Sequence, residues 1–187
     1  IFKWNKIKYS LNSFVWENSF TAKRIVNLIY NYDFYAVSAS IDEKILLKKI
    51  IIKHFFILKN NDNFDYKSID KPIEIQKSLL LFQAIYSLNT EQTINKIKKN
   101  LYRSINKNGM HNSMNPSMQA EYINNLVEIK NICLFFKINL PLEINFQINN
   151  MISTLKSLLH KDGSISLFNG SNNANIKNIK KIINLKK

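Results

Sequence analysis

Apolar residues recur at helical spacing along most of the 187-residue chain. One such set predicts a helix over about 20–35 and consists of Ile25, Leu28, Ile29 and Phe34. Five further sets follow a capping residue or a proline that suits the first turn of a helix, namely Ser40, Pro72, Thr90, Asn115 and Pro141. The pattern therefore predicts at least six helices joined by short loops, and an all-α fold.

The helix expected after Ser40 is apolar on two sides. Ser40 and Glu43 have the spacing of a capping box, which marks its start. One apolar stripe contains Ile41, Ile45, Ile52 and Phe56, and the opposite stripe contains Leu46, Leu47, Ile50, Ile57 and Leu58. A helix of this kind packs between neighbours, so the pattern favours layered helical hairpins or an α/α toroid. The polar run at 60–65 predicts a loop after this helix.

Two places, at 108–116 and 162–170, interrupt the helical pattern. The first follows a turn predicted at 106–109. The second follows Gly163, which suits a left-handed cap after a sixth helix that we expect to stop near His160. The alternating run at 164–168 predicts a short extended segment near the C-terminus. Irregular segments of a helical protein are where functional residues concentrate, so the candidate site is sought there.

Composition supports a folded helical protein and narrows its chemistry. Only three glycines and three prolines disfavour a many-turned β protein, and 45% hydrophobic residues exclude the disordered class. Cys133 is the single cysteine and lies in an apolar run, where a buried, inert thiol is expected. The most apolar stretch, 45–58, is interrupted by lysines and is too short to span a bilayer, so we expect no membrane partner.

The charge is strongly positive, with 27 Lys and Arg against 13 Asp and Glu and a formal net charge of +14. Heavy use of Asn, Ile and Lys is also what an AT-rich coding sequence produces. The lysines are dispersed, and the only arginines are Arg24 and Arg103. Readout of nucleic acid favours arginines in a patch, so we expect no nucleic-acid partner. Non-specific nucleic-acid binding by the lysines stays as a third alternative.

Three segments carry a family likeness. Residues 109–121 read GMHNSMNPSMQAE, a turn with a histidine followed by an Asn-Pro helix start, and residues 160–170 read HKDGSISLFNG. Residues 22–29 read AKRIVNLI. These segments resemble, in order and spacing, the D-G-G-H turn with its S-P or N-P step, the H-x-D-G-x-x-x-x-F-N-G segment and the R-I-x-N-W helix of heparinase II/III family proteins. Leu28 stands in place of the tryptophan.

The resemblance implies an incomplete α/α toroid of antiparallel helical hairpins over 1–170. It implies a basic tail or linker over 171–187 toward a C-terminal β-sandwich domain of the same full-length protein. The implied activity is that of a polysaccharide lyase acting by β-elimination on uronate-containing acidic polysaccharides. In that reaction a base removes the C5 proton, a neutralising group holds the carboxylate, and an acid protonates the leaving oxygen.

The chain departs from the family at two places. Met118 and Gln119 stand where active members have Tyr-His, and Glu74, Ile75 and Gln76 stand where they have Asn-His. We therefore expect this chain alone to be inactive. The alternative function is a non-catalytic helical scaffold that binds an anionic glycan or a protein partner.

His111 and Tyr122 are the candidate catalytic residues, His111 as a base and Tyr122 as a phenol on the same helix face as the missing tyrosine. The candidate substrate-binding residues are Arg24, Asn112, Asn115, Gln119 and Asn169. Structural alternatives stay open for most of them: packing of a turn for His111, the core for Tyr122, a tie between helix and loop for Arg24, a helix cap for Asn115, and a turn for Asn169.

The remaining histidines favour structural roles. His54 lies within an apolar stripe, which predicts a core histidine, and His160 is expected at a helix end, where a positive charge is favourable. The sequence contains no metal-ligand spacing and no Gly-rich phosphate loop, so we expect neither a metal nor a cofactor. Nothing in the sequence indicates the compartment.

Overall fold

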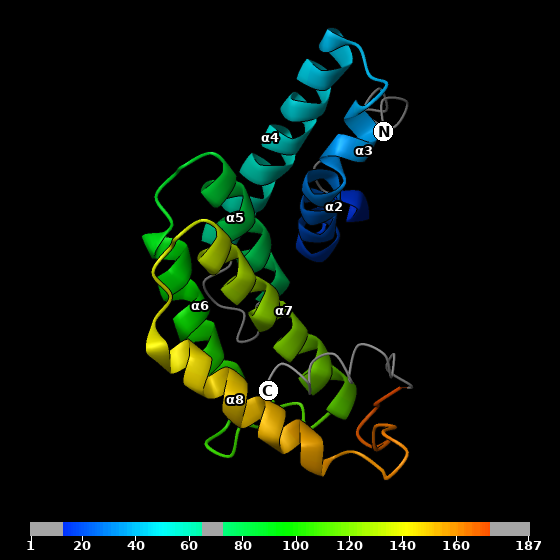
Figure 1. Cartoon of the computed structure of the whole chain (residues 1–187), viewed down its shortest axis with the longest axis vertical. Coiled ribbons are helices and arrows are strands. Elements are labelled where there is room, and N and C mark those ends of the chain that lie inside the picture. Colours follow the sequence, from blue (N-terminus) through cyan, green and yellow to red (C-terminus); the bar gives the residue numbers. More distant parts are fainter. Residues whose placement is uncertain (1–12, 65–72, 173–187) are drawn as a thin grey trace. The chain divides into compact units, whose positions relative to one another are not determined.

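The structure is a computed structural model that describes residues 13–64 and 73–172 (Figure 1). These residues form helices and isolated β-bridges but no strand, which confirms the predicted all-α fold; the toroid stays a prediction. None of the described helices is long and apolar enough to cross a membrane. In chain order the helices are η1 (Phe14–Trp16), α2 (Asn18–Tyr30), α3 (Tyr32–Ala36), α4 (Ile41–Phe64), α5 (Ile73–Ile85), α6 (Glu91–Ser104), α7 (Pro116–Phe135) and α8 (Leu142–Ser157).

The chain divides into two compact units, Ile1–Leu88 and Asn89–Lys187. The first unit contains η1 and α2 to α5, and the second contains α6 to α8. The predicted extent of a toroid domain over 1–170 and of a tail over 171–187 stays a prediction.

Side chains cap two of the predicted helix starts, those of α4 and α7. At α4 the Ser40 N–H donates to Glu43 Oε2 (2.9 Å) and the Glu43 N–H donates to Ser40 Oγ (3.3 Å), which confirms the capping box. At α7 Asn115 Oδ1 accepts from the Met118 N–H (3.0 Å), and Pro116 occupies the first turn as predicted. The starts of both helices are therefore set by local sequence.

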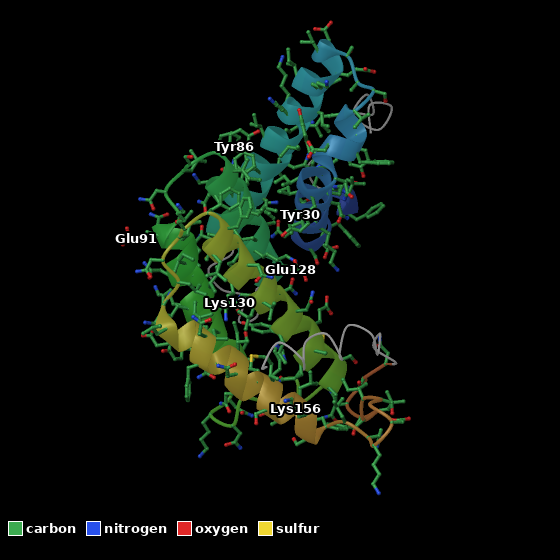
Figure 2. All side chains as sticks on the ribbon, in the orientation of Figure 1. Tyr30, Tyr86, Glu91, Glu128, Lys130 and Lys156 are labelled. Atoms are coloured by element: carbon green, nitrogen blue, oxygen red, sulfur yellow. The ribbon has the colours of Figure 1, made fainter. Side chains whose placement is uncertain are left out.

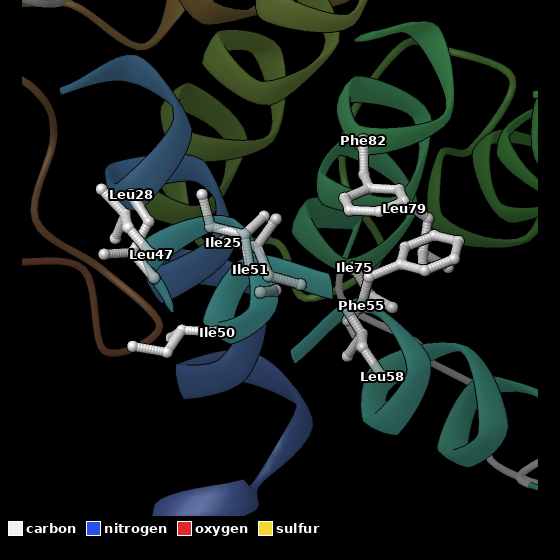
Figure 3. Packing of buried hydrophobic residues seen from close by; sticks show 11 residues of the cluster. Ile25, Leu28, Leu47, Ile50, Ile51, Phe55, Leu58, Ile75, Leu79 and Phe82 are labelled. Carbon is white, nitrogen blue, oxygen red and sulfur yellow. The ribbon is translucent and has the colours of Figure 1, made fainter. Parts of the chain in front are cut away.

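The core of the first unit lies between α2, α4 and α5, which pack against one another. Phe55 of α4 stacks on Phe82 of α5, with ring centroids 3.9 Å apart and planes at 11°. Figure 3 shows this cluster, whose buried members are Ala22, Ile25, Leu28, Leu47, Ile50, Ile51, Phe55, Leu58, Ile75, Leu79 and Phe82.

The expectation that α4 buries two opposite stripes is wrong. Ile41, Ile45 and Phe56 are 76%, 46% and 54% exposed, so α4 packs mainly through its other face. The loop predicted at 60–65 is also wrong, because α4 continues to Phe64. A contact distant in sequence accompanies this extension: the Asn61 amide donates to Asn18 Oδ1 of α2 (3.0 Å). Tertiary contact overrides the low helix propensity of asparagine here.

His54 is a core histidine, as predicted. Its side chain is completely buried, its ring lies 5.1 Å from the Trp16 ring, and its Nδ1 bonds the Ile50 carbonyl oxygen (2.7 Å). Burial penalises the imidazolium and, with a smaller contribution from the charges of Arg24 and Lys53, lowers the pKa of His54 to about 4. The ring is therefore neutral in the folded protein near neutral pH.

In the second unit α7 packs along α8. Apolar side chains at helical spacing line the buried faces, and Ile97, Ile129, Ile144, Met151 and Leu155 are completely buried. Cys133 on α7 is buried as predicted, and burial raises the pKa of its thiol to about 11. The thiol is thus protonated and inert at neutral pH.

A tight turn closed by an antiparallel β-bridge follows both α6 and α8. Ile105 bridges to His111 in the first turn and Leu159 bridges to Ile165 in the second, at positions 54 residues apart. Gly109 and Gly163 hold corresponding positions, with φ of +78° and +84°. The predicted turn at 106–109 is confirmed. The prediction that Gly163 caps a helix ending near His160 is wrong, because α8 ends at Ser157 and Gly163 closes the turn.

Gly109 provides the first stability prediction. A Cβ at Gly109 would lie 2.9 Å from the backbone carbonyl carbon of Asn150, whereas a Cβ at Gly170 would lie 3.7 Å from its nearest neighbour, Asn115 Nδ2. Gly170 also has a positive φ, of +76°. We expect Gly109→Ala to lower the free energy of unfolding by about 3 kcal/mol and Gly170→Ala by about 1 kcal/mol, as measured by urea denaturation. Equal losses would show that the close approach to Asn150 is unimportant.

His54 provides a pH prediction. The unfolded ring takes up a proton below its ordinary pKa of 6.5 while the folded ring stays neutral down to about pH 4. Stability is therefore full above pH 6.5 and falls as the pH is lowered toward 4, by about 3 kcal/mol for a completely buried ring. Urea denaturation at pH 7 and pH 4.5 should show a smaller decrease for His54→Leu than for the wild type. The same decrease in both proteins would contradict the assignment.

Candidate functional site

The residues between α6 and α7 are held in place by one buried side chain, Gln119. Its Oε1 accepts from the His111 N–H (2.7 Å), and its Nε2 donates to the carbonyls of Gly109 (2.8 Å) and Met151 (3.1 Å). Gln119 is completely buried. The structure therefore places this predicted substrate-binding residue in the core, where its amide joins the loop to α7 and α8.

His111 lies half-buried on this loop, with its ring 5.3 Å from the Tyr122 ring. The backbone N–H of Ser113 donates to His111 Nδ1 (3.2 Å), and the Ser113 hydroxyl lies 2.8 Å from the same nitrogen. A backbone N–H can only donate, so Nδ1 must be the acceptor. The neutral ring consequently carries its proton on Nε2, which makes that nitrogen a hydrogen-bond donor.

Tyr122 belongs to the interior of the second unit and is only 5% exposed. Its hydroxyl donates to Asn100 Oδ1 (2.9 Å), and the Ser104 hydroxyl donates to the same oxygen (2.9 Å). The phenol proton is thus engaged within a buried polar network. This matches the alternative of a core tyrosine, with a polar group that is paired.

Asn112 is exposed, and its amide donates to the carbonyl oxygen of Arg103 at the end of α6 (2.5 Å). The bridge between Ile105 and His111 lies beside this bond in the sequence. Asn112 therefore fixes the outer side of the loop, as Gln119 fixes its inner side.

The two irregular segments that the sequence singled out lie side by side. The Asn115 amide donates to the Asn169 carbonyl oxygen (2.9 Å), and the Asn169 amide donates to the Met114 carbonyl oxygen (3.1 Å). The hydroxyls of Ser117 and Ser171 are hydrogen-bonded to each other, with their oxygens 2.7 Å apart. Asn115 and Asn169 thus act as a cap and a clamp, and these bonds connect the likeness segments 109–121 and 160–170.

Arg24 belongs to the first unit and binds locally. Its guanidinium donates to the Val15 carbonyl oxygen and to Thr21 Oγ1 (3.2 Å), and it lies 5.5 Å from the centre of the Trp16 ring. Burial lowers the pKa of Arg24. The side chain ties η1 to α2, which is the structural alternative that the sequence left open.

Sequence reasoning missed the cluster around Trp16. The Trp16 ring is buried, and its neighbours include the Arg24 guanidinium, the His54 ring and the Lys53 ammonium. The Lys53 Nζ lies 5.2 Å from the centre of the Trp16 ring. No motif signals it, because Trp16 precedes the first predicted helix.

His160 is exposed in the turn after α8.

No group of three His, Cys, Asp or Glu that could hold a metal ion occurs within residues 13–64 and 73–172. Comparison with protein families, with curated proteins and with solved structures finds no match for this chain. The likeness to heparinase II/III proteins therefore stays a prediction that depends on the three segments quoted above.

The tautomer of His111 is directly measurable. We expect long-range ¹H–¹⁵N correlation spectra at a pH where the ring is neutral to show His111 protonated on Nε2. Ser113→Ala keeps the backbone donor and should keep this tautomer. Ser113→Pro removes the donor and should yield a mixture of tautomers. An Nδ1-protonated ring in the wild type would contradict the assigned hydrogen bond.

Proposed function

We propose that this chain is part of a polysaccharide lyase-like protein that acts on uronate-containing acidic polysaccharides by β-elimination, and that His111 binds the uronate carboxylate. The observation that carries the proposal is the Nε2–H tautomer of a half-buried histidine on a loop fixed from both sides. The resemblance to heparinase II/III proteins supplies the reaction class.

In this reaction a base takes the C5 proton, and the electrons of the broken C–H bond form the C4=C5 double bond. The bond from C4 to the leaving oxygen breaks, and that oxygen receives a proton. Negative charge develops on the carboxylate in the enolate-like transition state, so a hydrogen-bond donor placed there lowers the barrier. The His111 Nε2–H can be such a donor, whereas a ring protonated on Nε2 cannot use that nitrogen as the base.

A non-catalytic scaffold that binds an anionic glycan is the second candidate. It is favoured by the burial of Tyr122, whose hydroxyl donates to Asn100. In the scaffold, His111 would hold a carboxylate without any elimination. Both candidates make His111 a ligand-binding donor, and they differ only in whether a product forms.

The test uses two substitutions at His111, assayed with polygalacturonate and alginate. His111→Gln replaces the imidazole N–H by an amide N–H donor and should keep the affinity for the polysaccharide within a few fold. His111→Ala removes the donor and should weaken the affinity about tenfold. His160→Gln is the matched control, because His160 is also an exposed loop histidine. Turnover is followed by the ultraviolet absorbance of the unsaturated product. The assay is carried out with this chain and with a protein that includes the β-sandwich domain implied by the resemblance.

The outcomes separate the roles. Turnover retained in His111→Gln and reduced in His111→Ala supports a carboxylate donor. Turnover lost in both variants with full binding would instead make His111 the base. Binding without product in the wild type supports the scaffold, and no binding of any uronate polymer contradicts both candidates.

A further inference from the structure

Acidic residues are not evenly distributed among the basic residues of this chain. Glu91 stands in the first turn of α6 (Figure 2), and the next acidic residue is Glu121 on α7. The residues between them include α6, the tight turn and the His111 loop. All their charged side chains are basic: Lys96, Lys98, Lys99, Arg103 and Lys107. One continuous part of the second unit is therefore purely cationic.

Three of these cations are exposed and form a row in sequence, from α6 to the turn that leads into the His111 loop. Lys99 and Arg103 are four residues apart on α6, so they share a face at a spacing of roughly 6 Å along the helix axis. Lys107 is exposed in the turn that follows. None of the three forms an ion pair with a carboxylate of the described residues, in contrast to Lys98, whose Nζ lies 2.9 Å from Glu143 Oε1.

The row joins the His111 loop directly. The carbonyl of Arg103 accepts the Asn112 amide, and Ile105 bridges to His111. The C-terminal end of α6 carries the negative end of its helix dipole, which stabilises cations there without a carboxylate partner. Tyr102, beside Arg103, is 56% exposed and offers a ring face on which a sugar ring can stack.

We propose that Lys99, Arg103 and Lys107 form an anion-binding track that leads an acidic polysaccharide to His111. This inference rests on the proposed function and adds a binding surface to it. Lysine ammonium groups act as point charges and can pair with the single carboxylates that a polyuronate carries on each sugar. The track contains only one arginine, whereas recognition of nucleic acid favours several.

The experiment compares two triple variants of equal charge. The track variant is Lys99→Gln/Arg103→Gln/Lys107→Gln. The control is Lys48→Gln/Lys49→Gln/Lys156→Gln, which alters exposed lysines of α4 and α8. Binding of a fluorescent galacturonate oligosaccharide is titrated at several salt concentrations, and an RNA homopolymer serves as the competing polyanion. Circular dichroism checks that each variant is folded.

The track variant should bind the oligosaccharide at least about tenfold more weakly than the wild type at low salt, with a shallower salt dependence. The control should bind within about twofold of the wild type. Equal weakening in both triple variants overturns the track, because only net charge would then matter. Tighter binding of RNA than of the oligosaccharide overturns the choice of partner.

The design also separates this inference from the proposed function. If His111→Ala weakens binding while the track variant binds like the wild type, the track is wrong and the role of His111 stands. If the wild type binds no uronate polymer, the proposed function and the track both fail.

Discussion

The arrangement of the candidate site depends on one buried amide, that of Gln119. Two loop residues, His111 and Gly109, and one residue of α8, Met151, bond to this single side chain. A buried backbone group without a partner is costly, so each bond matters more through the penalty of losing it than through its own strength. Because Gln119 is the fourth residue of α7, the asparagine cap and the proline that start this helix also set the position of the amide. The residues that start α7 thus also fix the position of the loop that contains His111.

The second unit uses the same local design twice. The turns after α6 and α8 share a β-bridge, a glycine with positive φ and a spacing of 54 residues, and their continuations meet through Asn115 and Asn169. The turns differ in what they present: the bridging residue is the half-buried His111 in the first and the buried Ile165 in the second. The same turn structure therefore forms with a polar or an apolar bridging residue, so the turn itself does not depend on His111. The likeness segments coincide with these turns, so much of that likeness is explained by what the turn itself requires.

Local chemistry was predictable from the sequence, and contacts distant in sequence were not. Ser40, Glu43, Asn115 and Pro116 act within one helical turn, and their roles follow from spacing alone. The extension of α4 to Phe64 and the burial of a single face depend on its neighbours α2 and α5, which no local pattern reveals. Gln119 shows the same limit, because a glutamine three residues after the predicted Pro116 reads as a surface residue until α8 is known to lie behind it. Trp16 had no periodic pattern around it at all.

These placements change which residues are suited to ligand chemistry. Tyr122, Gln119, Asn115 and Asn169 belong to the likeness segments, yet their polar groups bond other parts of the chain. Rigid residues of this kind keep a loop in one conformation, and such order reduces the entropy lost when a ligand binds. A ligand still needs groups that can bind it, and exposed cations that pair with no carboxylate among the described residues meet that requirement. Lys99, Arg103 and Lys107 lie outside the quoted motifs or at their edge, so the specificity of this protein is better sought on α6 than in the residues that resemble a family.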